Sequence, residues 1–483
     1  MNRRSRKSAL PLLGLLVGLP SVALGNADTL SPPLDLTQHW AGYFSLVVMV
    51  SAYAAAMLEE VTHLRKSKPM LLGAALVWFA ISLVYRRHGQ VDAAVTAFAS
   101  NLLAYSELLL FIMVSMTYLN VMEDMRVFNA LRIALVRRRL GYRSLFWVTG
   151  ILVFFIACVI NGLTAGLLMG VVVVAVGRNS PRFVSLACIN IVVATNAGGS
   201  FSPLGGISTL FVWQKGMLQF TQFFTLFVPC LVNFLVPALA MHFALPRDRP
   251  LVEAECVVMQ RGAGGVVFLF GVTIGLAVFS DMYLHLPPAA GMMAGLSLLQ
   301  FFTFYLRKTS SRIAPGSQGV KLSLDEPDMP DGILETQRFD IFEKVGRLEW
   351  DTLLFFYGAM MGIGGLGFIG YLDAVSAWLY GQHSATLANV LIGLSSAFVD
   401  NGTLMFAVLS MHPELPEGQW LLVTLTLGVG GSLLAIGSAP GIALLGMTRG
   451  QYSFSSHLKW CPVILLGYFA AIGAHLIVNS RFF

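Results

Sequence analysis

Apolar runs long enough to cross a lipid bilayer recur along almost the whole sequence. A helix of about 20 apolar residues spans the hydrocarbon core. Its backbone N–H and C=O groups form hydrogen bonds within the helix, because hydrocarbon offers them no partner. Hydrophobic residues make up 56% of the 483 residues and charged residues only 12%, about half the share found in soluble domains. The sequence therefore predicts an all-α polytopic membrane protein and excludes an ordinary soluble enzyme.

The first 25 residues are typical of a secretory signal peptide. Four basic side chains between Arg3 and Lys7 precede an apolar stretch from Ala9 to Leu24. Cleavage would leave the mature N-terminus outside the cell membrane. The alternative is that residues 1–25 remain as a first hydrophobic segment.

The other apolar runs divide the chain into regions. A polar stretch from Arg307 to Arg347, rich in mixed charge, Pro, Gly and Ser, has the composition of a linker between two halves. We expect N-terminal transmembrane helices at 41–85, a first repeat at 93–242, connecting transmembrane helices at 263–305, a cytoplasmic linker at 306–348 and a second repeat at 349–479.

The distribution of Lys and Arg predicts the orientation. Cytoplasmic loops of membrane proteins are enriched in these residues, and the basic stretch from Arg126 to Arg143 is therefore assigned to the cytoplasm. Counting crossings from there leaves few basic side chains outside. The same enrichment explains the net charge of +6 without nucleic-acid binding. The basic residues on the expected outside are Arg86, Arg87, Lys215 and Arg481.

A Gly-rich motif occurs twice, each time after an apolar stretch with a polar centre. Residues 198–206 match residues 430–438 in register, and the preceding stretches are 144–177 and 385–411. We interpret each stretch as a re-entrant hairpin, because its polar centre would turn back within the membrane. The crossing count opens the first hairpin to the cytoplasm and the second to the outside, so the two halves form an inverted repeat.

Each Gly-rich motif interrupts a helix that would otherwise span the membrane. The freed backbone groups must line a cavity inside the protein. Paired breaks in inverted repeats are typical of secondary transporters, in which one central site opens alternately to each side. The alternative is that these small residues only allow close helix packing. The residues expected to line the unwound segments are Asn196, Gly198, Gly199, Ser200, Gly430, Gly431, Ser432 and Ser438.

Asp400 is the strongest candidate for carrying chemistry. A carboxylate inside a membrane is costly and is a functional hypothesis by default, and Asp400 lies at the centre of the second hairpin beside Asn401 and Thr403. A carboxylate with neutral oxygens suits a hard cation, for which a proton would compete. The alternative is a helix cap at the hairpin tip. Asn161 and Thr164 occupy the tip of the first hairpin.

Glu107 is the second carboxylate within an apolar run. It is a candidate for carrying protons. The alternative is a structural partner for a polar break in a neighbouring helix.

The sequence also argues against other classes of function. It contains no P-loop, dinucleotide-binding glycine pattern, zinc-ligand spacing or nucleophile elbow in a suitable context. We therefore expect no cofactor and no enzyme activity. The five cysteines have no paired or metal-binding spacing and are interpreted as packing residues: Cys158, Cys188, Cys230, Cys256 and Cys461.

Four segments carry a resemblance to a known family: Leu110 to Tyr118, Thr195 to Pro203, Val399 to Leu409 and Gly430 to Ala439. Together they resemble the NhaD-type sodium/proton antiporters of the ion transporter superfamily. The resemblance implies a multi-pass protein of the bacterial inner membrane that expels Na⁺ or Li⁺ in exchange for H⁺, with the lipid bilayer and a second copy in a homodimer as its partners. It also implies that the Asp-Asn pair of each hairpin handles the ion, with Asp400 holding Na⁺ transiently.

The sequence departs from the family pattern at central positions. The first hairpin has Asn161-Gly162 where the family has Asp-Asn, and Gly206 replaces an Asp after the first Gly-rich break. Gly402-Thr403 stands where the family usually has an apolar residue and Pro. Asn161 can coordinate a cation but cannot carry a proton. We therefore expect an altered proton count or weakened sodium exchange.

Two other functions remain open at this stage. One is a carrier of a small anion such as a dicarboxylate or arsenite, since half-helix N-termini bind anions, although Asp400 would repel one. The other is a protein that has lost transport and acts as a sensor or partner subunit, which the missing carboxylates favour.

Overall fold

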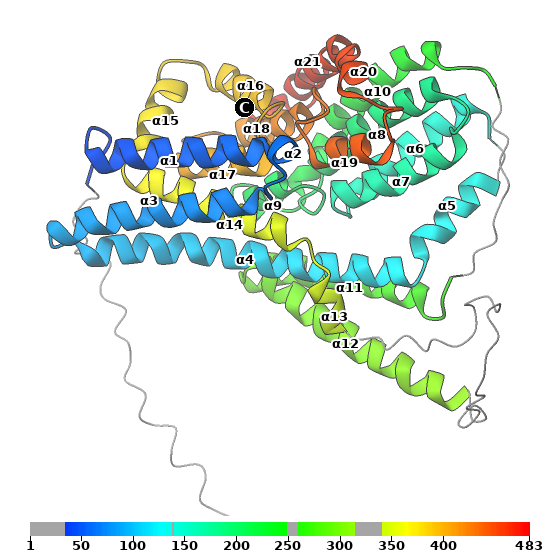
Figure 1. Cartoon of the computed structure of the whole chain (residues 1–483), viewed down its shortest axis with the longest axis horizontal. Coiled ribbons are helices and arrows are strands. Elements are labelled where there is room, and N and C mark those ends of the chain that lie inside the picture. Colours follow the sequence, from blue (N-terminus) through cyan, green and yellow to red (C-terminus); the bar gives the residue numbers. More distant parts are fainter. Residues whose placement is uncertain (1–33, 138–139, 249–258, 314–340) are drawn as a thin grey trace, which may run out of the picture.

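The computed structural model describes residues 34–137, 140–248, 259–313 and 341–483 (Figure 1). Within these ranges the regular elements are α-helices and short 3₁₀ helices, with no strand. Nine of the described helices are long and apolar enough to cross a membrane. The expected signal peptide at 1–25 and most of the expected linker at 306–348 lie outside the described residues.

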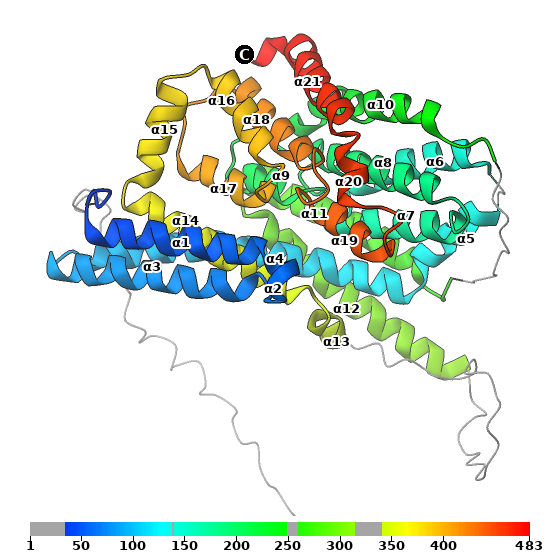
Figure 2. The ribbon, with the colours of Figure 1, turned by 45° about the horizontal axis from the view of Figure 1, so that its top comes forward.

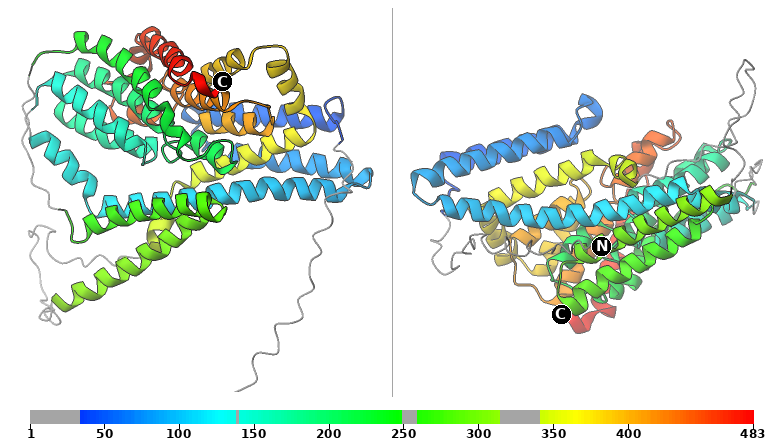
Figure 3. Two further views of the ribbon diagram at one scale, coloured as in Figure 1. Left: turned by 180° about the vertical axis from the view of Figure 1, so that it is seen from behind. Right: turned by 90° about the horizontal axis from the view of Figure 1, so that it is seen from below.

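Long helices form one side of the molecule. They are α1 (Trp40–Met57), α3 (Ser67–Arg87), α4 (Val91–Asp124), α11 (Ala263–Leu284), α12 (Pro288–Ile313) and α14 (Trp350–Phe368), with the short α2 (Glu59–Thr62) between α1 and α3. α3 packs against α1 and α14, and α4 packs against α14 and α12. Seen from below, α4, α11 and α12 run side by side across one face (Figure 3).

The helices that follow α4 form a first group: α5 (Val127–Arg137), α6 (Tyr142–Ala157), α7 (Gly162–Val176), α8 (Pro181–Ser200), α9 (Ile207–Gln214), the 3₁₀ helix η2 (Gln222–Leu226) and α10 (Phe227–Ala244). α6 and α7 form a helical hairpin. α8 continues through Gly198, Gly199 and Ser200, so these residues are helical and not unwound as expected, and the break before α9 covers residues 201–206. Asn196 and, in the second group, Gly430 are likewise helical. The first residue of α8 is Pro181, where a missing N–H costs no hydrogen bond.

The helices around and after α14 form a second group of the same order: α13 (Ile341–Gly346) before it, then α15 (Tyr371–Gly381), α16 (Ala385–Ser395), α17 (Asn401–Ser410), α18 (Glu417–Gly430), α19 (Ala439–Met447), α20 (Phe454–Leu458), α21 (Cys461–Val478) and the 3₁₀ helix η3 (Ser480–Phe482). α16 and α17 correspond in order to α6 and α7, and the pair α18 and α19 corresponds to α8 and α9.

The two groups pack against each other reciprocally. α7 packs against α19, α9 packs against α17, and α8 packs against α18. Figure 2 shows the four short helices α7, α9, α17 and α19 between the layer of α1, α3 and α4 and the outer helices α10 and α21. The hairpin tips and the helix breaks of both groups therefore meet in the middle of the molecule.

Two glycines of the repeated motif serve close packing. A Cβ at Gly198 would lie 2.1 Å from the carbonyl oxygen of Phe154, and a Cβ at Gly430 would lie 2.0 Å from that of Gly393. Each glycine lets a broken helix touch the backbone of the helix that begins its hairpin. At these two positions the glycines allow close helix packing, as the alternative interpretation of the Gly-rich motif expects.

Four helices differ from the expected layout. α5 and α15 occupy stretches for which no helix was expected, because a search for apolar runs misses short helices with one polar face. α12 continues to Ile313, into the range assigned to the linker, and α13 lies near the end of that range.

Candidate functional site

The candidate site is a cavity of about 80 Å³ at the meeting point of the two groups. Its wall includes the tips of both hairpins and the ends of the two helix breaks, at Gly205 and Gly206 and at Ser438. Among the described residues that line it, Asp400 is the charged one. The lining residues are Asn161, Gly162, Leu163, Thr195, Asn196, Gly199, Ser200, Gly205, Gly206, Ile207, Ser208, Asp400, Asn401, Gly428, Ser438, Ala439 and Pro440.

Four helices begin at this cavity. Asn161 is the N-cap of α7, Gly206 of α9, Asp400 of α17 and Ser438 of α19. The Asn161 side chain accepts a hydrogen bond from the Leu163 N–H at 3.3 Å. Helix N-termini carry partial positive charge, so four of them surround the cavity and the Asp400 carboxylate offsets part of that charge.

Asp400 is held from two sides. Its Oδ2 accepts hydrogen bonds from the backbone N–H and the hydroxyl of Thr403, at 3.1 and 3.3 Å. Its own backbone N–H donates to the hydroxyl of Tyr53 on α1, at 3.1 Å. The structure records no protein hydrogen bond to Oδ1 among the described residues, so this oxygen remains available to the cavity. The sequence did not identify Tyr53 as a site residue, because it lies in an ordinary apolar run outside both repeats.

The two broken helices contact each other beside Asp400. The Asn196 side chain donates to the hydroxyl of Ser438 at 3.0 Å, which joins α8 to the start of α19. The Ser200 hydroxyl donates to the Asn196 carbonyl at 2.6 Å. A Cβ at Gly428 of α18 would lie only 2.0 Å from the Ser200 hydroxyl oxygen, so glycine is needed for this contact.

The structure brings together only part of the expected set. Asp400, Asn401, Asn161, Asn196, Gly199, Ser200 and Ser438 line the cavity. Thr403 contacts Asp400 from the side. Gly198, Gly430, Gly431 and Ser432 are absent from the described lining. Gly431 instead faces Gly437 across its loop, as Gly199 faces Gly205.

Glu107 lies elsewhere. It is half-buried on α4 and interacts electrostatically with Lys215, the residue that follows α9. It is not among the residues that line the central cavity.

A second cavity, of about 300 Å³, lies between α4, α5, α7 and the start of α14. Thr164 lines this cavity, whereas the preceding residue, Leu163, lines the central one. Consecutive residues of α7 therefore line the two cavities. Glu123, Arg132, Arg347 and Glu349 give the second cavity a polar wall. Burial raises the pKa of Glu349, against the opposing effects of Thr352 and Lys66.

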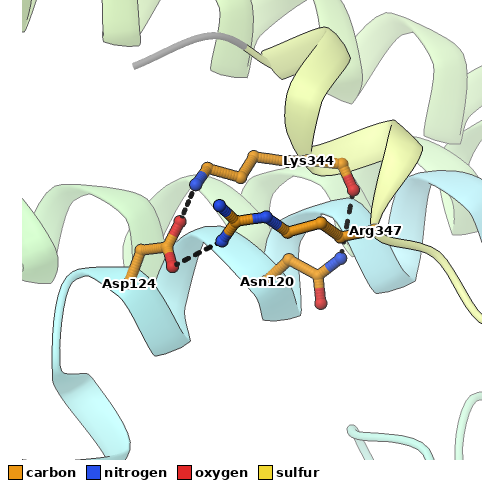
Figure 4. Close-up of polar contacts among 4 residues, drawn as sticks. All are labelled: Asn120, Asp124, Lys344 and Arg347. Carbon is orange, nitrogen blue, oxygen red and sulfur yellow. Dashed lines mark hydrogen bonds and ion pairs between the residues drawn. The ribbon is translucent and has the colours of Figure 1, made fainter. Parts of the chain in front are cut away.

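Ion pairs join two elements beside this second cavity (Figure 4). Asp124, the last residue of α4, pairs with Lys344 of α13 and with Arg347, the latter at 3.7 Å. The Asn120 side chain donates to the Lys344 carbonyl at 3.2 Å. Lys344 is buried, so Asp124 balances a charge that water does not reach.

The second helix break is supported by a buried histidine. His457 of α20 contacts the carbonyl oxygen of Ser432 through Nε2 at 3.0 Å and the Tyr452 hydroxyl through Nδ1 at 2.7 Å. Burial lowers the pKa of His457 to about 4, although hydrogen bonds to the Ser432 and Leu433 backbone oppose the shift. A neutral imidazole therefore connects α20 to the unwound segment.

Comparisons with known proteins cover nearly the whole chain. A family model described as "Citrate transporter" matches residues 53–428. The Na(+)/H(+) antiporter NhaD of Vibrio cholerae is 50% identical over 474 residues, which is 98% of this chain and 99% of that protein. The Na(+)/H(+) antiporter NhaD of Alkalimonas amylolytica is 48% identical, over 98% of this chain and 97% of its own length. Sodium/proton antiporter 1 of Arabidopsis thaliana is 26% identical, over 89% of this chain and 71% of its own length.

Proposed function

The chain belongs to the family of NhaD-type sodium/proton antiporters, and we propose that it exchanges Na⁺ or Li⁺ for H⁺ at the central cavity, with the Asp400 carboxylate as the group for which cation and proton compete. Sodium/proton exchange itself follows from relatives that are about half identical over nearly their full length. The assignment to Asp400 rests on one observation: it is the charged side chain among the described residues lining the cavity where both groups meet.

The arrangement of the helices supports alternating access. The element order α6 to α9 recurs as α16 to α19, and the short helices pack reciprocally across the cavity. We propose that these are inverted repeats with re-entrant hairpins, as paired helix breaks at a midplane site suggest. In the proposed orientation the second cavity opens toward the cytoplasm, and rearrangement of one turn of α7 near Thr164 would connect it to Asp400.

The proposed setting is the bacterial inner membrane. Large apolar side chains face outward from several spanning helices, as lipid contact requires: Phe243 of α10 is 81% exposed and Phe268 of α11 is 71% exposed. A homodimer of this chain is also proposed, by analogy with relatives in the superfamily.

The number of carboxylates limits the proposed proton count. Neither Asn161 nor Gly206 supplies a titrating group to the cavity, and Glu107 lies apart from it. One carboxylate can exchange one proton for one sodium ion without moving net charge. We therefore propose exchange of low electrogenicity.

The decisive experiment is sodium-driven proton movement in everted vesicles from a host that lacks its own antiporters. The wild type is expected to dissipate an imposed pH gradient on addition of Na⁺ or Li⁺, and Asp400→Asn is expected to abolish this response. Asp92→Asn is the matched control, because Asp92 is exposed in the first turn of α4 and should leave exchange unchanged. Full exchange by Asp400→Asn would refute the proposed site.

A small-anion carrier is the second candidate, because four helix N-termini surround the cavity and the matching family model is described as a citrate transporter. Asp400 opposes it, since a carboxylate repels an anion. Uptake of radiolabelled citrate by the same vesicles separates the two. Citrate uptake without sodium-dependent proton movement would favour the carrier, and a folded, inserted wild type with neither activity would favour a transport-deficient sensor.

A further inference from the structure

The hydroxyl of Thr195 is a buried polar group without a recorded partner. Thr195 lies in α8 on the wall of the central cavity and is only 1% exposed. Among the described residues the structure records no hydrogen bond to its Oγ1. A buried hydroxyl that stays unbonded costs free energy, and its persistence in a native protein calls for an explanation.

Four other buried threonines in helices of this protein do not share the problem. Each donates its hydroxyl hydrogen to the carbonyl four residues earlier in its own helix, at 2.7 to 2.8 Å. The examples are Thr117, Thr149, Thr273 and Thr424. This local bond is the usual solution for a threonine inside a membrane helix. Thr195 has the same bond available to Ile191 and does not make it.

Glycines of α7 leave room for the Thr195 side chain. A Cβ at Gly162 would lie 3.0 Å from the Thr195 methyl carbon, and a Cβ at Gly166 would lie 3.8 Å from its hydroxyl oxygen. Two glycines of α7 thus face this side chain. Thr195 lines the same cavity as Asn161 and Asp400.

We infer that Thr195 Oγ1 is a ligand of the transported Na⁺ or Li⁺. Hard cations prefer oxygen ligands and commonly combine a carboxylate with neutral oxygens. A hydroxyl oxygen that makes no bond within its own helix can turn its lone pairs to the ion while Asp400 balances the charge. This inference rests on the proposed antiport at the central cavity, and it adds a neutral ligand from the half of the protein that lacks a cavity carboxylate.

The test compares three variants. Thr195→Val keeps the shape and removes the hydroxyl, Thr195→Ser keeps the hydroxyl, and Thr424→Val removes a buried hydroxyl that is already bonded within its helix. In proteoliposomes, Thr195→Val is expected to raise the KM for Na⁺ about tenfold, the effect of losing one interaction with an ion, while the maximal rate stays near that of the wild type. Thr195→Ser should retain the wild-type KM, and Thr424→Val should lower the melting temperature without changing the KM.

A second measurement keeps the inference separate from the antiport proposal. Saturating Na⁺ should raise the melting temperature of the purified wild type, because a ligand stabilises the folded state that binds it. Thr195→Val should need about tenfold more Na⁺ for the same rise. A wild type that binds Na⁺ but performs no exchange would refute the antiport proposal alone. An unchanged Na⁺ dependence in Thr195→Val, or no stabilisation of the wild type by Na⁺, would overturn the role of Thr195.

Discussion

Gly206 is a single position at which the charge of the central cavity can be changed. It lies on the cavity wall as the N-cap of α9, with an extended backbone (φ −136°, ψ 153°) that any residue adopts. The nearest atom to a Cβ built there is the Thr209 hydroxyl oxygen, at 3.4 Å. An aspartate therefore fits, and it is also a favoured N-cap residue.

We predict that Gly206→Asp makes exchange more electrogenic. A second carboxylate in the cavity can carry a further proton per sodium ion, so the exchange rate should respond more strongly to an imposed membrane potential than in the wild type. The measurement is sodium-driven proton movement in proteoliposomes with potassium and valinomycin setting the potential. Gly206→Asn is the control for size without charge. Equal voltage responses of Gly206→Asp and Gly206→Asn would contradict the prediction.

The position of Asp400 is compatible with both roles between which the sequence alone could not decide. Its Oδ2 caps α17 through the Thr403 N–H, as the helix-cap interpretation expects. The cap uses one oxygen, whereas Asp400 also lines the cavity. A capping aspartate at a hairpin tip is therefore compatible with ion binding, because the N-terminus fixes the carboxylate in place.

At the scale of elements, the ion pairs between α4 and α13 fix where the second half begins. Lys344 is buried and its ammonium pairs with Asp124. Removing one partner of a buried ion pair leaves the other charge uncompensated, which costs about 3 kcal/mol. We predict that Asp124→Asn lowers the free energy of unfolding by about that amount, measured as a loss of melting temperature in detergent.

A double variant tests this explanation. Lys344→Met in the Asp124→Asn background removes the uncompensated charge and keeps most of the side-chain volume. It should recover much of the lost stability, because the penalty belongs to the unpaired ammonium. If the double variant is as unstable as Asp124→Asn, the loss comes from something other than the buried charge.

The buried His457 predicts how stability depends on pH. Its pKa is about 4 in the folded protein against an ordinary value of 6.5, so the unfolded chain binds more protons between these values. The free energy of unfolding is therefore fully maintained above about pH 6.5 and decreases as the pH falls toward 4, by up to about 3 kcal/mol. Melting temperatures over this pH range measure the decrease.

His457→Gln provides the comparison for this pH dependence. Glutamine can still bond to the Ser432 carbonyl but does not titrate, so the variant should show a weaker decrease of stability below pH 6.5. His63→Gln should leave the profile unchanged, because His63 is exposed in the turn after α2. A wild-type slope in His457→Gln would assign the acid sensitivity to other groups.

The elements differ in how far the sequence could predict them. Asn161 and Asp400 interrupt long apolar runs, and each proves to be the N-cap at a hairpin tip. Thr195 and Tyr53 carry no such signal, since a threonine or tyrosine in an apolar helix usually has an ordinary structural partner. Glu107 shows the opposite limit. The cost of its charge in a membrane is evident from the sequence, but its electrostatic interaction with Lys215 depends on the folded chain.

For the whole molecule, the orientation determines which side each cavity faces. The expected outside contains Arg86 and Arg87, the last two residues of α3, which run against the usual enrichment of basic residues in the cytoplasm. The opposite orientation would place the basic stretch from Arg126 to Arg143 outside, which would put more basic residues on the wrong side than Arg86 and Arg87 do. The second cavity, bordered by Arg132 and Arg347, then faces the cytoplasm.

This orientation predicts that the C-terminus at Phe483 lies outside the inner membrane. α21 is the last spanning helix, and it leaves the cytoplasmic side when the crossings are counted from the basic stretch. Alkaline phosphatase fused after Phe483 should be active, and green fluorescent protein fused there should stay dark. Fusions after Ile313, at the end of α12, should give the reverse pattern, because that end is cytoplasmic in the same count. A fluorescent C-terminal fusion would invert the assignment of both cavities and with it the direction in which the second cavity supplies ions to Asp400.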